Sequence, residues 1–518
     1  MRYRFKRVPY KHQKDAIRKL TSTGFGGALL MEPRTGKTQV AIDYACIMHE
    51  AGKVNRVLIS CPVAVMGVWE QELEAVIPDR IKYTVTIWDK KGRRNQMLPK
   101  WGKDRLDFVI INHDGFAAPG RIMLNPDGTR KLDRHGNIRR SRTRGGRYEM
   151  KRAFLLWQPQ LVCLDESHRY KTTSSAKFRT MYSILWDRTN KIYRVPYRII
   201  MTGTPITKKK RVFDIYAQWR LLNNRRFRAM TIDDFKHHFG RFIDKGNYEM
   251  WVGNRPEEVE KLRAVIHRDS FAVTRDECYD IPRAVSSTVP LELEGDTAKA
   301  YDEMAEWMVA QLKSGEITEA SIKLVQAMRL AQITTGVAKT LPSKEHPKGQ
   351  LIRIGHEKLT VLESLLSDLF EADEKVVVAA RFSHDISAIG AICDRLKVKH
   401  FTLQGRRKGA HQSRTERTRD ILRFKTMEGP ACYVVQPQSG SMGIDLSSAA
   451  TLIWYSLTNS WVDYTQMNDR IALNPHGSIM HLLASPVDYL LFESLQEDGN
   501  VAKMITDSPE RLLRNYKA

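Results

Sequence analysis

The stretch LLMEPRTGKTQVA, residues 29–41, decides the fold class of the N-terminal half of the chain. An apolar run that ends at Met31 leads into Gly36, Lys37 and Thr38, and an apolar-periodic helix that stops at Gly52 follows. A strand that delivers such a turn to a helix N-terminus is typical of a phosphate-binding loop, because backbone N–H groups and the helix dipole there meet phosphate oxygens. The first glycine of the usual loop pattern is replaced by Met31.

The residues of this loop predict a site for ATP and Mg²⁺. Gly36 lets the backbone approach a phosphate, and Arg34 and Thr35 complete the loop around it. Lys37 is expected to reach the β and γ phosphates, and Thr38 to offer its hydroxyl to Mg²⁺.

A second stretch, LVCLDESHRYK at residues 161–171, predicts the catalytic partners of the loop. A buried strand there delivers two carboxylates to its carboxyl end. We expect Asp165 to hold Mg²⁺ and Glu166 to orient or deprotonate the attacking water. His168 follows two places on and is a candidate coupling residue.

Apolar runs that alternate with helical patterns predict two parallel-sheet α/β lobes in tandem with a helical insertion between them. The strand candidates are residues 27–31, 56–61, 108–112, 161–164 and 198–201, then 375–380, 400–403, 432–436 and 451–455. The expected domains are an ATP-binding lobe at 1–221, a helical insertion and linker at 222–293, and a second lobe at 294–518.

Charge indicates a polyanionic partner. Lys and Arg number 84 against 59 Asp and Glu, which gives a formal net charge of +25, and nucleic acid is the common partner of such proteins. A basic insertion at 117–156 carries turn-forming triplets at 126–128 and 135–137, which predict a hairpin-like excursion. Its Arg139 and Arg140 are candidate phosphate contacts; a solvated insertion without a ligand is the alternative.

Composition excludes several other classes. No apolar run approaches the roughly 18 residues of a membrane helix, and the basic N-terminus lacks the apolar centre of a signal peptide. The six cysteines are scattered without a C-x-x-C pair, so they are expected to be reduced core residues. A soluble, cytoplasmic protein without a membrane partner is expected.

With these motifs in view, the sequence resembles superfamily 2 helicases and, within them, the SNF2-like double-stranded DNA translocases with two RecA-like lobes. The family's loop also lacks the first glycine, in agreement with Met31. YKHQ (residues 10–13) resembles the element whose glutamine reads adenine, which implies Gln13 as the base contact. MTGTPI (201–206) resembles the segment that couples hydrolysis to DNA engagement through Thr202 and Thr204.

The same resemblance implies DNA contacts and a second set of nucleotide residues. LISCPVAVMGVWEQEL (58–73), INHDGF (111–116) and VVVAARFSHDI (376–386) are similar to DNA-facing segments, and SGSMGIDLSSA (439–449) is similar to a motif that touches both DNA and nucleotide. The implied nucleic-acid contacts are Trp69, Asn112 and Arg381, and the implied nucleotide contacts of the second lobe are Gly443, Asp445, Gln466 and Arg470.

The last motif departs from the family pattern. Relatives carry two arginines three residues apart that reach the γ-phosphate, whereas QMNDRIALNPHG (466–477) has Arg470 followed by Leu473. A guanidinium at such a site can contribute several orders of magnitude in rate. Either Arg470 suffices, which we favour, or the enzyme is slow, or Arg414 or His476 compensates.

These observations predict a DNA-dependent ATPase that moves on double-stranded DNA, binds mainly its phosphate backbone, and remodels DNA or protein–DNA complexes. ATP is expected between the lobes, which switch as the γ-phosphate is lost. The compact length resembles bacterial or bacteriophage members. An RNA helicase, a nuclease-associated motor subunit and a non-catalytic nucleic-acid clamp remain alternatives.

Overall fold

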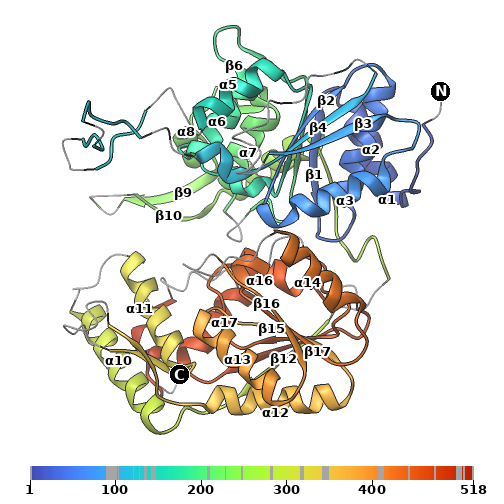
Figure 1. Ribbon diagram of the computed structural model, residues 1–518. Coiled ribbons are helices and arrows are strands. Elements are labelled where there is room, and N and C mark those ends of the chain that lie inside the picture. The colour runs from blue at the N-terminus through green and yellow to red at the C-terminus, as the bar shows by residue number, and fades with distance from the viewer. Residues whose placement is uncertain are drawn as a thin grey trace. The chain divides into compact units, whose positions relative to one another are not determined.

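The computed structural model forms two compact units, Met1–Asp280 and Ile281–Ala518 (Figure 1). The residues that the structure describes are 3–88, 98, 102, 104–118, 120, 122–127, 129–133, 137–141, 147–206, 211–227, 229–244, 246, 249–280, 284–314, 320–340, 349–405, 414–440, 444–471, 474–497, 504–505 and 508–515.

The first unit is built on a parallel seven-stranded sheet with the strand order β11-β1-β8-β5-β2-β4-β3. Each of its central strands is an almost unbroken apolar run, as expected when both faces of a parallel sheet are covered. The strands are β1 (Gly26–Met31), β2 (Arg56–Cys61), β3 (Tyr83–Trp88), β4 (Leu106–Asn112), β5 (Leu161–Asp165), β8 (Tyr197–Met201) and β11 (Ser270–Val273).

Helices cover both faces of this sheet, so the first unit has three layers (Figure 1). Successive strand residues point to opposite faces; Leu58 packs in one core and Ile59 in the other. One face holds α1 (Lys11–Ser22), α2 (Lys37–Glu50) and α3 (Met66–Val76). The other holds α5 (Arg147–Trp157), α6 (Ala176–Leu185), α7 (Asp214–Leu222) and the short helix η2 (His113–Ala117).

The segment expected to be a helical insertion contains strands as well as helices. Besides α8 (Ile232–Phe239) and α9 (Pro256–Asp269), it forms an antiparallel hairpin of β9 (Gly240–Asp244) and β10 (Glu249–Asn254). Its strand β11 pairs with β1 and thereby joins the first sheet, with Ala28 opposite Ser270. The segment therefore contributes directly to the sheet that carries the P-loop.

The second unit repeats the architecture with a parallel six-stranded sheet in the order β12-β19-β18-β15-β17-β16. The strands are β12 (Val285–Pro290), β15 (Lys375–Ala379), β16 (Lys399–Leu403), β17 (Ala431–Val435), β18 (Thr451–Trp454) and β19 (Ser478–Leu483). Helices α12 (Glu357–Glu371) and α13 (Ser383–Arg395) pack in one core. The other core takes α10 (Gly295–Lys313), α11 (Ala320–Ile333), α14 (Arg414–Thr426), α16 (Trp461–Asn468) and α17 (Pro486–Gln496). The predicted pair of parallel-sheet α/β lobes is confirmed.

Smaller features of the sequence can also be compared with the structure. The basic insertion forms three antiparallel bridges, Ile122 with Arg140, Leu124 with Arg130 and Leu132 with Ile138, so the predicted hairpin-like excursion is confirmed. It projects from the body of the first unit in Figure 1. Five of the six cysteines are buried and Cys278 is partly buried. Among the described residues, no helix has both the length and the apolar composition needed to cross a membrane.

Candidate nucleotide-binding site

The P-loop turn lies between the end of β1 and the start of α2, where its glycine is required by the geometry. Gly36 is the N-cap of α2 with a φ of 86°, in the region that favours glycine. A Cβ atom there would lie 1.9 Å from Gln13 Nε2. Arg34 also has a positive φ, 67°, and strained backbone of this kind gathers at functional sites.

The side chain of the P-loop lysine bonds to the backbone of its own loop. Lys37 Nζ donates to the carbonyl oxygens of Met31 at 2.8 Å and Glu32 at 3.1 Å. The Thr35 hydroxyl, which is buried, donates to the same Glu32 carbonyl at 2.8 Å. Thr38 lies in the first turn of α2 and is half-buried. The predicted phosphate-binding residues are therefore brought together on one turn.

Residues at the start of α1 contact this turn directly. Gln13 Nε2 donates to the Thr35 carbonyl at 3.3 Å, and Gln13 Oε1 accepts from the Tyr10 amide at 2.8 Å. His12 Nε2 lies 2.9 Å from the same Thr35 oxygen. Gln13 is thus placed beside the P-loop; its role as the base contact stays a prediction.

An aromatic cluster that the sequence motifs do not indicate lies beside the loop. Tyr279 donates its hydroxyl to the Arg34 carbonyl at 3.1 Å. Its ring meets the rings of Tyr10 and His12 edge-on, with centroids 6.0 and 5.9 Å apart. Tyr279 follows β11, far from the P-loop in sequence, so only the pairing of β11 with β1 could have indicated it.

The carboxylate pair lies at the carboxyl end of β5, as predicted. Asp165 accepts from the Trp69 indole N–H at 2.9 Å and from the Glu166 amide at 3.0 Å. Burial, followed by the nearby Glu166 carboxylate, raises the pKa of Asp165 to about 6, although Trp69 and Lys37 act in the opposite direction. Glu166 itself has a φ of 49°, another strained position at the site.

A polar cluster joins Glu166 to the end of β8. The Glu166 Oε2 atom lies 3.3 Å from His168 Nδ1 and accepts from the Thr202 hydroxyl at 3.4 Å. His168 Nδ1 and Thr202 Oγ1 are 3.0 Å apart, and the Thr204 amide donates to that hydroxyl at 3.0 Å. The three predicted coupling residues therefore form one connected group with the predicted base.

Gln218 of α7 holds the loops that carry this cluster, and the motifs did not indicate it. Its side chain accepts from the Ser167 hydroxyl at 2.7 Å and donates to the Pro205 carbonyl at 2.7 Å. It thereby bridges the loop after β5 to the loop after β8.

Thr38 and Asp165 fit a magnesium site of the P-loop kind. Mg²⁺ is usually bound by one or two protein oxygens together with substrate phosphates, so a hydroxyl and one carboxylate suffice. A nearby divalent cation would favour the ionised form of Asp165, whose pKa is raised by burial. Among the described residues, no group of three or more His, Cys, Asp or Glu forms a separate metal site.

Two predicted nucleic-acid contacts lie in the interior instead. Trp69 is 2% exposed and donates its indole N–H to Asp165. Arg381 is 7% exposed, and its guanidinium donates to Asn459 Oδ1 at 2.9 Å; burial lowers the pKa of Arg381 to about 10. The side chains of Trp69 and Arg381, which the sequence suggests as surface contacts, instead hold neighbouring loops in place.

The other predicted contacts differ in exposure. Asn112 caps η2 by accepting from the Gly115 amide at 2.7 Å. Arg139 and Arg140 are exposed on the projecting hairpin, where the Arg140 guanidinium also donates to the Gly120 carbonyl at 3.3 Å. Among these three residues, Arg139 and Arg140 have side chains that are exposed to a phosphate backbone.

In the second unit, Arg470 is buried and connects two predicted motifs. Its guanidinium donates to the carbonyls of Gln466 at 2.9 Å and Ile444 at 3.0 Å. Asp445, next to Ile444, pairs with Lys425 at 2.7 Å. Gly443 and Leu473 lie outside the described residues.

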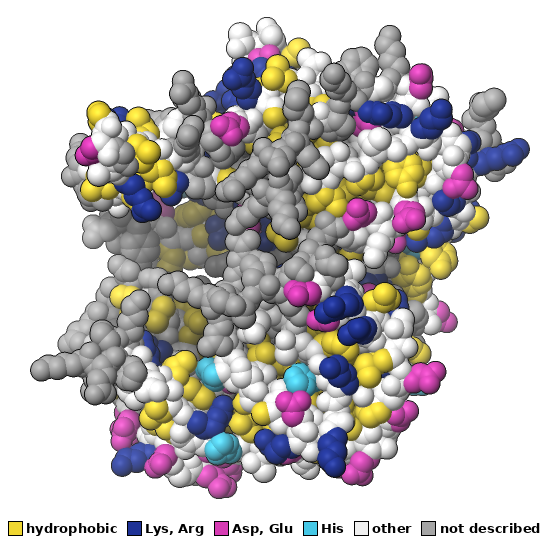
Figure 2. Space-filling view, in the orientation of Figure 1, with side chains coloured by type: hydrophobic (Ala, Val, Ile, Leu, Met, Phe, Trp, Pro, Cys, Tyr) yellow, Lys and Arg dark blue, Asp and Glu magenta, His cyan; other side chains and the backbone are white. Residues whose placement is uncertain are grey.

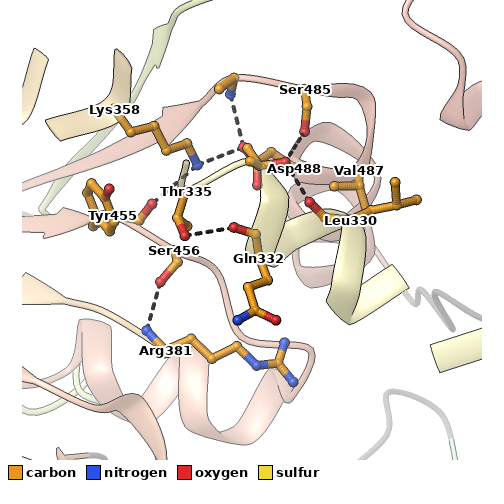
Figure 3. Close-up of polar contacts among 12 residues, drawn as sticks. Leu330, Gln332, Thr335, Lys358, Arg381, Tyr455, Ser456, Ser485, Val487 and Asp488 are labelled. Atoms are coloured by element: carbon orange, nitrogen blue, oxygen red, sulfur yellow. Dashed lines mark hydrogen bonds and ion pairs between the residues drawn. The ribbon is translucent and has the colours of Figure 1, made fainter. Parts of the chain in front are cut away.

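A buried polar network supports the Arg381 loop (Figure 3). The Arg381 amide donates to the Ser456 hydroxyl at 2.7 Å. The carbonyl of Tyr455, the residue before Ser456, accepts from Lys358 Nζ at 3.2 Å. Lys358 in turn pairs with Asp488 at 2.7 Å. The two charged side chains are only 1% and 3% exposed.

Two parallel-sheet units, a P-loop and a carboxylate pair at the end of another strand of the same sheet define a P-loop nucleotide-binding protein. The family model described as the SNF2-related domain matches residues 12–341, and the helicase conserved C-terminal domain matches 357–472. The chain belongs to the SNF2-related family.

Two proteins with similar sequences are much longer than this chain. The CHD3-type chromatin-remodeling factor PICKLE of Arabidopsis thaliana is 21% identical over 306 residues, which cover 58% of this chain and 20% of that protein. Chromodomain-helicase-DNA-binding protein 1-like of Danio rerio is 19% identical over 422 residues, covering 81% and 35% respectively. The chain thus spans about a third or less of the length of these relatives.

Among solved structures, the Sulfolobus solfataricus SWI2/SNF2 ATPase core in complex with dsDNA is similar over 99% of this chain and 98% of that one, with 19% identity and a TM-score of 0.40.

Proposed function

We propose that this protein is an ATP-dependent translocase of double-stranded DNA that remodels DNA or protein–DNA complexes. One observation carries the proposal: in a chain of the SNF2-related family, Glu166 at the end of β5 lies 3.3 Å from His168 Nδ1 and accepts a hydrogen bond from Thr202, which follows β8. A hydrolytic base that shares contacts with a second strand end can respond to changes there, as a coupled motor requires.

The P-loop residues would bind the phosphates of ATP. Lys37 would exchange the carbonyls of Met31 and Glu32 for phosphate oxygens, which reverses the closure of the loop. Gln13 would read the base, and the ring of Tyr279 offers a face on which the base can pack.

The carboxylates divide their roles according to their surroundings. Asp165 and Thr38 would hold Mg²⁺, which when bound neutralises charge on the phosphates. Glu166 would accept a proton from the attacking water. His168 and Thr202 position its carboxylate, so movement at the end of β8 would alter the rate of that proton transfer.

Nucleic acid would be bound mainly through phosphates. The net charge of +25 and the exposed Arg139 and Arg140 favour weak sequence preference and a strong dependence on salt. Arg470 would act on the nucleotide from the second unit, after release from the carbonyls of Gln466 and Ile444.

Steady-state ATP hydrolysis tests the proposal. The wild type, Lys37→Ala and Arg470→Ala are assayed alone, with duplex DNA and with duplex RNA. We expect duplex DNA to stimulate hydrolysis by the wild type, and we expect both substitutions to abolish this stimulation. Stronger stimulation by RNA than by DNA would identify RNA as the substrate. ATP binding without turnover in the wild type would support a non-catalytic nucleic-acid clamp instead of a motor.

A further inference from the structure

A groove outside the nucleotide site lies over helices α5 and α6 of the first unit. Its volume is about 440 Å³, and it extends from the start of α5, along α6, to the hairpin of β6 (Trp186–Asp187) and β7 (Ile192–Tyr193). Figure 2 shows Lys and Arg side chains exposed at the end of the unit that carries β6 in Figure 1.

The charge of the groove is strongly positive. One carboxylate, Asp187, lines it, and that carboxylate pairs with Arg194 at 2.9 Å. The cations of the lining are Arg147, Lys151, Arg179, Arg188 and Arg194. None of the described carboxylates forms an ion pair with Lys151 or Arg179. An anion in the groove would therefore find several cations with unfilled bonding capacity.

The arrangement of these cations costs stability in the absence of an anion. Arg147 and Lys151 are four residues apart on α5 and so lie on one helix face, where like charges destabilise a helix. The Arg147 guanidinium is held beside the Tyr148 ring and donates to its hydroxyl at 2.9 Å. Arg188 lies over the Tyr182 ring, 5.9 Å from its centroid. Within the described part of the chain, these ring contacts leave most of the guanidinium donors of both arginines free for phosphate oxygens.

The shape of the groove favours a chain of phosphates over a single anion. Helix α6 has 10 residues, which makes it about 15 Å long at 1.5 Å per residue. Phosphates of one DNA strand rise about 3.4 Å each along the duplex axis and also wind around it, so a groove of this length can meet more than one of them. Four of the five cations are arginines, whose planar fork matches phosphate oxygens in pairs.

The groove is distinct from the nucleotide site. The P-loop and the carboxylate pair lie at the carboxyl ends of β1 and β5, whereas the β6–β7 hairpin comes just before β8 begins at Tyr197, at the amino end of the sheet. At its other end the groove starts at Arg147, the first residue of α5, which lies within the basic insertion of residues 117–156.

We propose that this groove binds the phosphate backbone of duplex DNA as a second contact, separate from the one that stimulates hydrolysis. The inference rests on the proposed function, since it assumes that duplex DNA is the substrate. A second contact with the duplex would raise the affinity for DNA without changing the chemistry of ATP hydrolysis.

The test variant is Arg179→Glu/Arg188→Glu, and Arg179→Gln/Arg188→Gln is a milder companion. Both positions are exposed, so the fold should persist, as thermal melting would verify. The matched control is Lys53→Glu/Lys82→Glu, two exposed lysines of the same unit with the same change in net charge. Anisotropy of a labelled duplex measures Kd over a series of salt concentrations, and ATP hydrolysis is measured with and without DNA.

We expect the Glu variant to weaken DNA binding at least tenfold more than the control does. Loss of two phosphate contacts should flatten the slope of log Kd against log salt by about 1.8. Hydrolysis without DNA should be unchanged, and more DNA should restore full stimulation.

The outcomes separate the two proposals. If the wild type neither binds duplex DNA nor is stimulated by it, the proposed function fails. If the wild type does both and the groove variant equals the control, the groove inference fails alone. If labelled poly-glutamate binds the wild type more tightly than DNA does and the groove variant abolishes that binding, the groove is a site for acidic protein segments instead.

Discussion

Replacing Trp69 by phenylalanine should move the pH dependence of Mg²⁺–ATP binding to higher pH. The indole N–H donates to Asp165 at 2.9 Å, and this bond favours the ionised carboxylate, whose pKa burial has raised to about 6. Phenylalanine keeps most of the packing but has no donor. The protonated form of Asp165 therefore gains relative to the ionised form that Mg²⁺ requires.

The size of the shift follows from the energy of one charge-assisted bond. Such a bond contributes about 1.5–3 kcal/mol, and one pKa unit corresponds to about 1.4 kcal/mol. The pKa of Asp165 should therefore rise by about one to two units, from about 6 to roughly 7–8. At pH 7 the ionised fraction would fall from about 90% to between about 10% and 50%.

Binding of a fluorescent ATP analogue with Mg²⁺, titrated across pH, measures this shift. The wild type should lose affinity as the pH falls through about 6, and the Trp69→Phe variant should lose it at higher pH. Trp219→Phe is the control, since Trp219 is equally buried and its indole has no hydrogen-bond partner among the described residues. Identical midpoints for the wild type and Trp69→Phe would refute the assigned role of the indole.

Four further predictions concern hydrolysis, base binding and stability. Glu166→Gln should lower the rate of hydrolysis about 10²- to 10⁴-fold while ATP still binds, because the general base is lost. Thr202→Val removes a donor to Glu166 and should lower DNA-stimulated turnover about tenfold with a smaller effect on ATP affinity. Tyr279→Ala should raise the KM for ATP about tenfold, because base stacking contributes about 1–3 kcal/mol, whereas Tyr279→Phe should not. Lys358→Met should lower the free energy of unfolding of the second unit by about 3–5 kcal/mol, because Asp488 is left buried and unpaired; urea unfolding measures this.

Each of these has a contradicting result. Unchanged turnover in Glu166→Gln would assign the base elsewhere, and an equal loss with and without DNA in Thr202→Val would make that residue structural. A raised KM in Tyr279→Phe would point to its bond with Arg34 rather than to its ring. For the ion pair, Lys358→Met/Asp488→Leu should recover most of the lost stability; no recovery would mean that packing, not charge, carries the effect.

Local pattern was enough to predict the elements that position the catalytic groups. An apolar run that is followed by the Gly36–Lys37 turn, or that ends at Asp165 and Glu166, specifies a buried parallel strand with its polar residues at one edge. The contacts among Glu166, His168 and Thr202 then follow from the adjacency of β5 and β8.

Features that depend on distant parts of the chain could not be read in the same way. Strand β3, with the half-buried sequence YTVTIW, lies at the edge of its sheet and lacks a continuous apolar run. Trp69 and Arg381 have apolar bodies with polar ends, so their sequence context suits a surface contact and a buried hydrogen bond equally well. Only the three-dimensional arrangement of their partners decides between these uses.

The pairing of β11 with β1 has a consequence for biosynthesis. Ala28 lies opposite Ser270, so on the ribosome the strand that carries the P-loop waits for its outer neighbour while some 240 further residues are made, on the order of ten seconds or more at cellular rates of elongation. During that interval one edge of β1 is an open template for other strands. Nascent chains of this protein should therefore need a chaperone until β11 emerges, and a fragment that ends before residue 270 should aggregate although it contains every P-loop residue.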